Sequence, residues 1–163
     1  MRCVKKMTGS NRLTISKTPL RAISPAPQVE THADAFPEVD PGILPFGQRV
    51  LIQIRRPRTR SAGGVEYTDE SRETIKWNTQ VGKIIAFGPL AFCNRTTQQP
   101  WPEGAWCKVG DFVRVPKHGG DRWEVSVPGS AAGYENAALF VIFDDLNLIG
   151  KVTGDPLTVK AYV

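Results

Sequence analysis

The chain has 163 residues, of which 40% are hydrophobic and 23% charged, and this composition is ordinary for a soluble globular protein of one domain. No run approaches the roughly 18 apolar residues that a membrane-spanning helix needs, so no transmembrane helix and no membrane partner are expected. Three cysteines, Cys3, Cys93 and Cys107, are too few and too scattered for a disulfide framework, which favours a reducing intracellular compartment. A bond between Cys93 and Cys107 across a hairpin stays open.

The net charge of +5 is unevenly distributed along the chain. Residues 1–30 hold six basic residues and one acidic residue, whereas the remaining 133 residues hold 15 of each. The basic character therefore belongs to the N-terminal region. The rest of the chain carries no net charge that would favour binding to nucleic acid, so no specific nucleic-acid partner is expected.

Residues 1–44 are rich in Pro, Ser, Thr, Lys and Arg and show little sustained periodicity. Segments 24–27 and 38–42 have the Pro and Gly content of turns or extended chain. We therefore predict a basic, Pro/Ser/Thr-rich N-terminal arm that is poorly structured. Residues 1–30 also have the acid-poor, Arg- and Ser-bearing composition of an organelle transit peptide, and the arm could equally order on a partner.

From Pro45 onward the chain shows the two-residue period of β-strands. In segment 49–55, Val50, Ile52 and Ile54 alternate with polar residues, which predicts a strand with one apolar face. Further strands, separated by Gly, Pro and Asp turns, are predicted at 81–87, 112–115, 122–127, 139–143 and 146–149. No amphipathic helix of ten or more residues stands out, so the sequence predicts an all-β barrel or sandwich.

Two long polar connections, 57–79 and 89–106, interrupt the predicted strands. Connections longer than about 12–15 residues are uncommon in compact domains and are often functional. We therefore expect function to reside in these two insertions.

The chemistry of catalysis is sparse in this sequence. Gly63-Gly64 lacks the patterns of phosphate-binding and dinucleotide-binding loops. His32 and His118 have no neighbouring Cys or His at metal-ligand spacing, and Asp144-Asp145 would point to opposite faces of a strand. We expect a binding or assembly protein with no enzymatic activity, no metal and no cofactor.

The order of elements from Pro45 to Val152 resembles the GroES-type co-chaperonins of the chaperonin-10 family. The segments that carry the resemblance are the strand beginning Arg49-Val50, Ser61-Ala62-Gly63-Gly64, Val81–Gly88, Lys108–Val113, Gly119-Gly120 and Asp144–Gly150. The long arm and the enlarged second insertion resemble a bacteriophage-encoded, divergent member. The resemblance covers residues 45–152 and leaves residues 1–44 and the C-terminal extension 153–163 without a counterpart.

The resemblance implies a GroES-like, partly open β-barrel with a long mobile loop and a roof hairpin. Such subunits form a homo-oligomer, a heptameric ring, in which the first and last strands of neighbouring subunits pair. The ring-interface residues would be Arg49, Val50, Leu51, Ile52, Leu146, Leu148, Ile149 and Val152. The roof hairpin would carry Leu90, Phe92, Trp101 and Trp106.

The resemblance also implies a function. The ring would form a lid on a large, ATP-driven, GroEL-type chaperonin and enclose folding client proteins, in the cytoplasm of a host if phage-encoded. The mobile loop, near residues 57–79, would dock through Ser61, Ala62, Gly63, Gly64, Val65, Glu66 and Tyr67. Family members have three consecutive apolar residues after the glycines, and Glu66 departs from that pattern. In an extended segment, Val65 and Tyr67 would face the groove and Glu66 would face water.

Two other functions are compatible with the sequence. One is a virion structural protein, for decoration or cement, that uses a GroES-like barrel and orders its arm on a neighbour. The other is an organelle co-chaperonin with a transit peptide.

Overall fold

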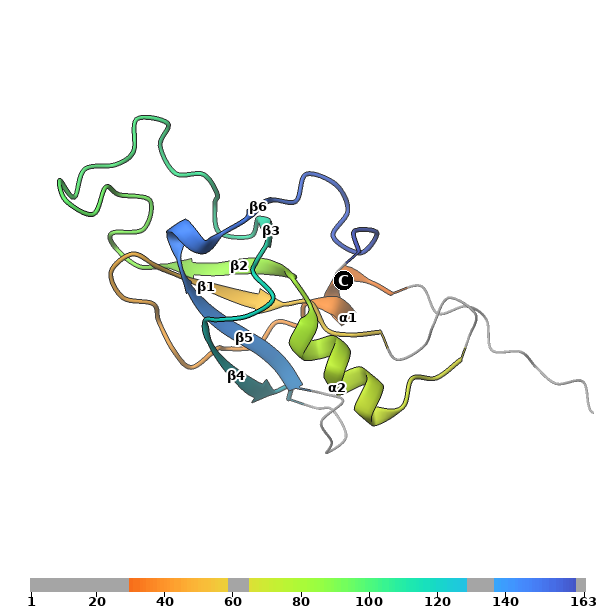
Figure 1. Cartoon of the computed structure of the whole chain (residues 1–163). Helices are drawn as coiled ribbons and strands as arrows, with labels where there is room; N and C mark the ends of the chain where they lie inside the picture. Colours follow the sequence, from red (N-terminus) through yellow and green to blue (C-terminus); the bar gives the residue numbers. More distant parts are fainter. Residues whose placement is uncertain (1–29, 59–64, 129–136, 161–163) are drawn as a thin grey trace, which may run out of the picture.

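A computed structural model describes residues 30–58, 65–128 and 137–160. These residues form one open, antiparallel, six-stranded sheet with few helices, which confirms the prediction of a mainly β protein (Figure 1). Along the sheet the strands are β4 (Asp121–Ser126), β5 (Ala137–Asp144), β1 (Arg49–Ile54), β2 (Val81–Phe87), β3 (Phe112–Arg114) and β6 (Gly150–Lys151). The helices are α1 (His32–Ala35), α2 (Asp69–Asn78) and the 3-10 turn η2 (Asp145–Asn147). Among the described residues, no helix is both long enough and apolar enough to span a bilayer.

Strand β1 lies in the middle of the sheet. It pairs with β5 along its whole length, from Arg49 opposite Asp144 to Ile54 opposite Leu139, and with β2 on its other side. Both backbone edges of β1 are therefore occupied within the chain. The expected pairing of this strand with a neighbouring subunit has no free edge to use, because the open edges of the described sheet belong to β4 and β6.

The expected last strand is shorter than the sequence indicates. Residues 145–147 form the turn η2, and only Gly150 and Lys151 continue as β6, which pairs with β3 of the same chain. The amides of Ile149 and Val152, on either side of β6, donate hydrogen bonds to the carbonyl oxygens of Arg114 and Phe112 of β3. The outer edge of β6 in the described sheet remains open.

The sheet buries apolar side chains on both faces. One face carries the larger core, made of alternate residues of four strands and of the segments next to them: Val50, Ile52, Ile54, Ile84, Phe92, Cys107, Val113, Val115, Leu139, Val141 and Phe143. The other face carries Leu51, Ala138 and Phe140, with the Trp123 ring stacked on Phe140 at 5.9 Å between ring centroids. Burying a side chain of this size stabilises the fold by about 1.5–3 kcal/mol.

Residues 30–41 cover part of the second face, and we call them the N-terminal strap. Thr31 and Asp34 form a capping box around α1, and Phe36 is buried against Phe112, with ring centroids 5.1 Å apart. Farther along, the Nε2 of Gln53 donates a hydrogen bond of 2.7 Å to the carbonyl oxygen of Pro37. The prediction of a poorly structured arm is therefore wrong for this part of residues 1–44, because the strap satisfies polar groups and fills space on the sheet.

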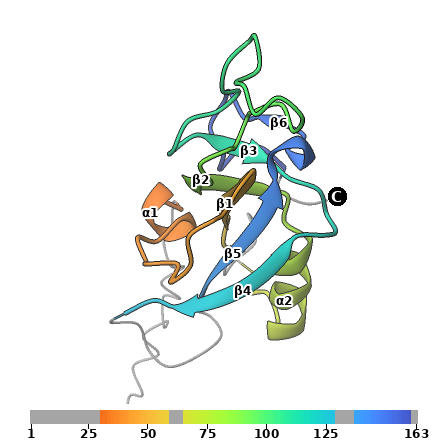
Figure 2. The ribbon, with the colours of Figure 1, turned by 90° about the vertical axis from the view of Figure 1, so that its left-hand side faces the viewer.

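Helix α2 has ten residues, although no amphipathic helix of that length stands out in the sequence. The side chain of Thr68 caps its first turn, Asp69 and Glu70 follow, and Lys76 lies in the last turn, an order of charges that suits the helix dipole. The helix has a weak apolar face, since Ile75 and Trp77 are its only large apolar residues. Figure 2 shows α2 beside β4, and contacts described below join the two.

Candidate functional site

The connection between β1 and β2 is the first of the two insertions singled out by the sequence. Four of its expected docking residues, Ser61, Ala62, Gly63 and Gly64, lie outside the described residues. The other three follow directly: Val65 is 69% exposed, Glu66 is exposed and Tyr67 is half-buried. An apolar side chain thus stands in solvent immediately after the glycine pair, where the docking anchor is expected.

Two arginines, Arg55 and Arg58, hold the connection where it leaves the sheet after β1. Arg55 is only 7% exposed, and its Nη1 donates hydrogen bonds to the carbonyl oxygens of Pro156 at 2.9 Å and Val159 at 3.2 Å. Its Nη2 lies 3.2 Å from Oε2 of Glu30, the first residue of the strap. A buried guanidinium needs such partners, since an unpaired buried charge costs several kcal/mol or more.

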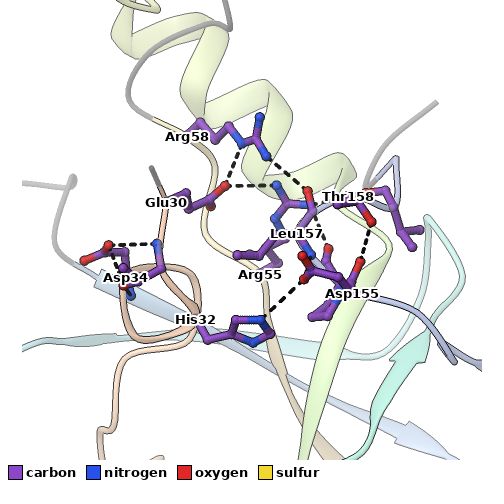
Figure 3. A network of polar contacts seen from close by, with 11 residues as sticks. Glu30, His32, Asp34, Arg55, Arg58, Asp155, Leu157 and Thr158 are labelled. Atoms are coloured by element: carbon purple, nitrogen blue, oxygen red, sulfur yellow. Dashed lines mark hydrogen bonds and ion pairs between the residues drawn. The ribbon is translucent and has the colours of Figure 1, made fainter. Parts of the chain in front are cut away.

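Arg58 closes the same arrangement from outside (Figure 3). Its Nε lies 2.6 Å from Oε2 of Glu30, and its Nη2 donates to the carbonyl oxygen of Leu157 at 3.0 Å. One carboxylate oxygen therefore joins both arginines, and one C-terminal segment accepts from both. We call Glu30, Arg55, Arg58 and the carbonyl groups of Pro156, Leu157 and Val159 the clasp.

Arg56, between the two clasp arginines, lies against the strap. Its amide donates to the carbonyl oxygen of Ala35 at 3.0 Å. Burial lowers the pKa of the Arg56 guanidinium, the positive charge of Arg72 on α2 lowers it further, and Asp34 opposes both effects. The Arg56 guanidinium therefore interacts with a charge on α2, that of Arg72, and with a charge on the strap, that of Asp34.

The connection returns to the sheet through α2. Nζ of Lys76 lies 2.5 Å from a carboxylate oxygen of Glu124 on β4, and Nη1 of Arg122 donates to the carbonyl oxygen of Trp77 at 2.9 Å. Burial lowers the pKa of Arg122. Thr79, 1% exposed, donates through Oγ1 to the carbonyl oxygen of Ile75. Both ends of the connection are therefore fixed to the body of the molecule, and the fixed ends flank the expected docking segment.

The second insertion is organised by aromatic rings. Phe92 is buried and packs edge-on against Phe87 and Trp106, and Trp101 stacks on Trp106 with centroids 6.4 Å apart. The structure thus brings together three of the four residues expected in a roof hairpin, while Leu90 is half-buried nearby. A single bridge, Cys93 to Pro100, takes the place of a regular hairpin ladder among the described residues. Figure 1 shows this insertion as the green loop that extends beyond the sheet.

A buried carboxylate, which the sequence analysis considered only as half of the rejected pair Asp144-Asp145, supports this insertion. Asp145 is 1% exposed, and its Oδ2 accepts a hydrogen bond of 2.7 Å from the amide of Phe92, 53 residues away. Its Oδ1 accepts from the amide of Leu146 and lies 3.7 Å from Arg95. Phe92 has a φ of 59°, a left-handed conformation that is unfavourable for a bulky residue, and the carboxylate helps to hold it there.

The expected ring-interface residues fall into two groups. Val50, Leu51 and Ile52 are fully buried within β1, whereas Arg49 is exposed at its first position. In the C-terminal group Leu146 and Ile149 are exposed, and Leu148 and Val152 are half-buried. Apolar surface is also exposed just before β1, at Ile43, Leu44 and Phe46.

The described residues show little that resembles a catalytic centre. His118 is exposed in a turn, and Nε2 of His32 lies 3.4 Å from Oδ1 of Asp155 beside the clasp. Cys93 and Cys107 are free thiols, and burial raises the pKa of Cys107. Within residues 30–58, 65–128 and 137–160, no three His, Cys, Asp or Glu side chains gather as a set of metal ligands.

No protein-family model matches the chain.

Proposed function

We propose that this protein is a GroES-type co-chaperonin, whose ring caps an ATP-driven chaperonin and which docks through the connection between β1 and β2. The observation that carries the proposal is the placement of exposed Val65 directly after Gly63-Gly64, in a connection fixed at both ends to the sheet. An apolar side chain exposed in such a position suits insertion into an apolar groove of a partner. The ATP chemistry then belongs to the chaperonin, and this chain acts as a lid.

A single docking segment is expected to bind the chaperonin only weakly. Each segment loses about 1–2 kcal/mol of backbone entropy per residue that becomes fixed on the partner. A ring presents several copies at once, and this multivalency raises the overall affinity by roughly 10²–10⁴ over that of one segment. Strong summed binding built from weak contacts allows a lid to leave in each cycle.

The arrangement of β1 changes where the ring interface should lie. Since β1 has no free edge, we place the contact at the open edge of β6 and at exposed Leu146 and Ile149. Exposed Leu44 and Phe46, just before β1, supply apolar surface for the opposing side of the contact. Pairing along an open edge would also protect it from unspecific association.

The proposal is tested by mixing the purified protein with a GroEL-type chaperonin and ATP. We expect a stable complex, a changed ATPase rate and assisted refolding of a client protein. Val65→Asp should abolish the complex, since it places a charge where an apolar groove is expected, whereas Val109→Asp changes an equally exposed valine elsewhere and should not. Absence of a complex with host and common bacterial chaperonins would overturn the proposal.

A virion structural role is the competing function. It relies on an arm that orders on a neighbouring molecule, but the strap, residues 30–41 of the arm, packs on its own sheet. Mass spectrometry of purified particles distinguishes the two, because a decoration protein must be present in them.

A further inference from the structure

We propose that the clasp sets the direction and position of the docking segment, so that the strap and the C-terminal residues 155–159 belong to the docking apparatus. In this role Glu30, Arg55 and Arg58 are positioning residues, which act through the backbone that follows them. The inference rests on the proposed function, and it adds a task for two segments that have no counterpart in the family that the chain resembles.

The clasp joins three distant parts of the chain at one point. Glu30 lies 25 residues before Arg55, Pro156 lies 101 residues after it, and Leu157 lies 99 residues after Arg58. That point is the end of β1, where the chain leaves the sheet. The amide of Arg55 still bonds to Val81, so the sheet ladder continues to the first arginine and the clasp continues from there.

The geometry fixes side chains and backbone together. Arg55 is held by the sheet through its amide and by Glu30 and two C-terminal carbonyl groups through its guanidinium. Residue 56 is held by the strap through its amide, and residue 58 through its guanidinium. Three of the four residues 55–58 are therefore held by contacts with the strap or the C-terminal segment, at the start of the docking connection.

We call residues 55–58 the root of the docking connection. A root that is already ordered lowers the conformational entropy lost on docking. When the chain before a binding segment is already ordered, fewer residues lose conformational freedom on binding, and the affinity rises. Charge-assisted hydrogen bonds are suited to this task because they are strong and directional. The side chain of Glu30 is only 15% exposed and that of Arg55 only 8%, so water screens their contact weakly.

The test uses the full chain with two single substitutions, the double variant that combines them, and one matched control. Glu30→Gln removes the charge that joins both arginines. Arg58→Gln removes only the more exposed half of the clasp, at a side chain 45% exposed, and keeps the buried Arg55–Glu30 pair, so it folds even if the first variant does not. The double variant tests whether Glu30 and Arg58 act together. Glu38→Gln, the control, makes the same carboxylate-to-amide change at an exposed position of the same strap, outside the clasp and outside α1.

Two readouts separate positioning from general stability. Amide hydrogen exchange of Arg56, Arg58 and residues 65–67 in the free protein reports on the order of the connection, and the affinity for the chaperonin with ATP reports on docking. We expect each clasp variant to exchange faster at these amides and to bind on the order of tenfold more weakly. The double variant should bind no more weakly than Glu30→Gln alone. Glu38→Gln should match the wild-type protein in both measurements.

The outcomes are distinguishable from failure of the proposed function. If the wild-type protein binds and the clasp variants bind equally well, or no more weakly than Glu38→Gln, the positioning role is overturned. The same holds if the clasp variants leave exchange at Arg56 and Arg58 unchanged. If the wild-type protein itself fails to bind any chaperonin, the proposed function falls, and the docking role of the clasp falls with it.

Discussion

The indole of Trp123 on β4 donates a hydrogen bond of 2.9 Å to the carbonyl oxygen of Pro41, 82 residues earlier in the chain. The same ring stacks on Phe140 of the neighbouring strand. One side chain therefore ties the end of the strap to the apolar face that the strap helps to cover. This relationship makes the strap part of the folded unit and gives a way to measure its contribution.

Replacing Trp123 with Phe should loosen the end of the strap. Phe keeps an aromatic ring against Phe140 but cannot donate to Pro41, so the variant should lose about 1 kcal/mol of unfolding free energy in urea. Proteolysis should then become faster within residues 37–44. Trp77→Phe, at a more exposed tryptophan on α2, serves as the control for loss of an indole. Equal stability of Trp123→Phe and the wild-type protein would show that the bond to Pro41 contributes nothing.

The carboxylate of Asp145 should be required for the second insertion. In Asp145→Asn one of the two acceptor oxygens becomes a donor, and it would face the amide of either Phe92 or Leu146. We expect a loss of about 2 kcal/mol of unfolding free energy, since a buried amide loses its partner. The fluorescence of Trp101 and Trp106 should change with it, because their packing depends on Phe92.

Asp144→Asn provides the matched comparison for Asp145→Asn. Its side chain is 46% exposed and lies 3.7 Å from the same Arg95. A small effect of this neighbour, within about 0.5 kcal/mol, is expected for a surface carboxylate. If both variants lose equal stability, the effect comes from the charge near Arg95 and the hydrogen bond to Phe92 is unimportant.

The pH dependence of stability should include a contribution from Asp111. A hydrogen bond from Lys151, at 2.6 Å, and one from the amide of Lys108, at 2.8 Å, lower the pKa of this carboxyl below its ordinary value of 3.8. Between the ordinary and the lowered pKa the unfolded chain binds more protons than the folded one, so the stabilisation is present above about pH 4 and is lost as pH falls below it.

Asp111→Asn should therefore flatten the acid limb of the stability curve. The measurement is the urea midpoint between pH 5 and pH 2.5, a range that contains the ordinary pKa and extends below it. Lys151→Met should flatten the same limb in part, because it removes the first cause of the shift and leaves the amide of Lys108. Parallel curves for the wild-type protein and Asp111→Asn would refute this assignment.

The sequence predicts the strands well because their cause is local. In β1 the alternation of Val50, Ile52 and Ile54 follows directly from the geometry of an extended chain. This alternation does not predict that Gln53 and Arg55 are also buried, at 3% and 7% exposure. Their hydrogen-bond partners come from Pro37, from Glu30 and from the C-terminal segment. Burial of a polar side chain depends on partners that no local pattern reveals.

Helix α2 and the strap were missed for different reasons. The helix has little apolar periodicity, and only its ends carried a signal: Thr68 as a cap, acidic residues in the first turn and Lys76 in the last. The strap buries two apolar residues, Ala35 and Phe36, in a stretch rich in Pro and acids. Its conformation depends on the sheet surface beneath it, so tertiary contacts decide what composition alone could not.

The proposed ring contact predicts the effect of Phe46→Ser. Phe46 is 79% exposed in the single chain, and burying such a ring against a neighbour would contribute about 1.5–3 kcal/mol per contact. Its loss should shift the assembly toward smaller species in analytical ultracentrifugation at micromolar protein. Val109→Ser changes another exposed apolar residue outside the proposed contact and should leave the assembly unchanged. A wild-type protein that is monomeric throughout would contradict the ring itself.

Glu66 gives the sharpest test of how the docking segment works. Val65 and Glu66 are both exposed in the free protein, and the proposed groove is apolar. Burying a carboxylate there without a partner would cost several kcal/mol, so Glu66→Val should tighten chaperonin binding by on the order of tenfold or more if the residue enters the groove. If alternation in an extended segment turns Glu66 toward water, the affinity should stay the same.

A matched substitution separates groove contact from net charge. Glu73→Val removes the same charge from an exposed position on α2, outside the docking segment. Tighter binding by Glu66→Val alone places residue 66 in the groove, and equal tightening by both variants assigns the effect to long-range electrostatics, which 0.5 M salt should then suppress. Weaker binding by Glu66→Val would mean that the carboxylate makes a favourable contact with the partner, and the docking surface would have to include a basic group opposite residue 66.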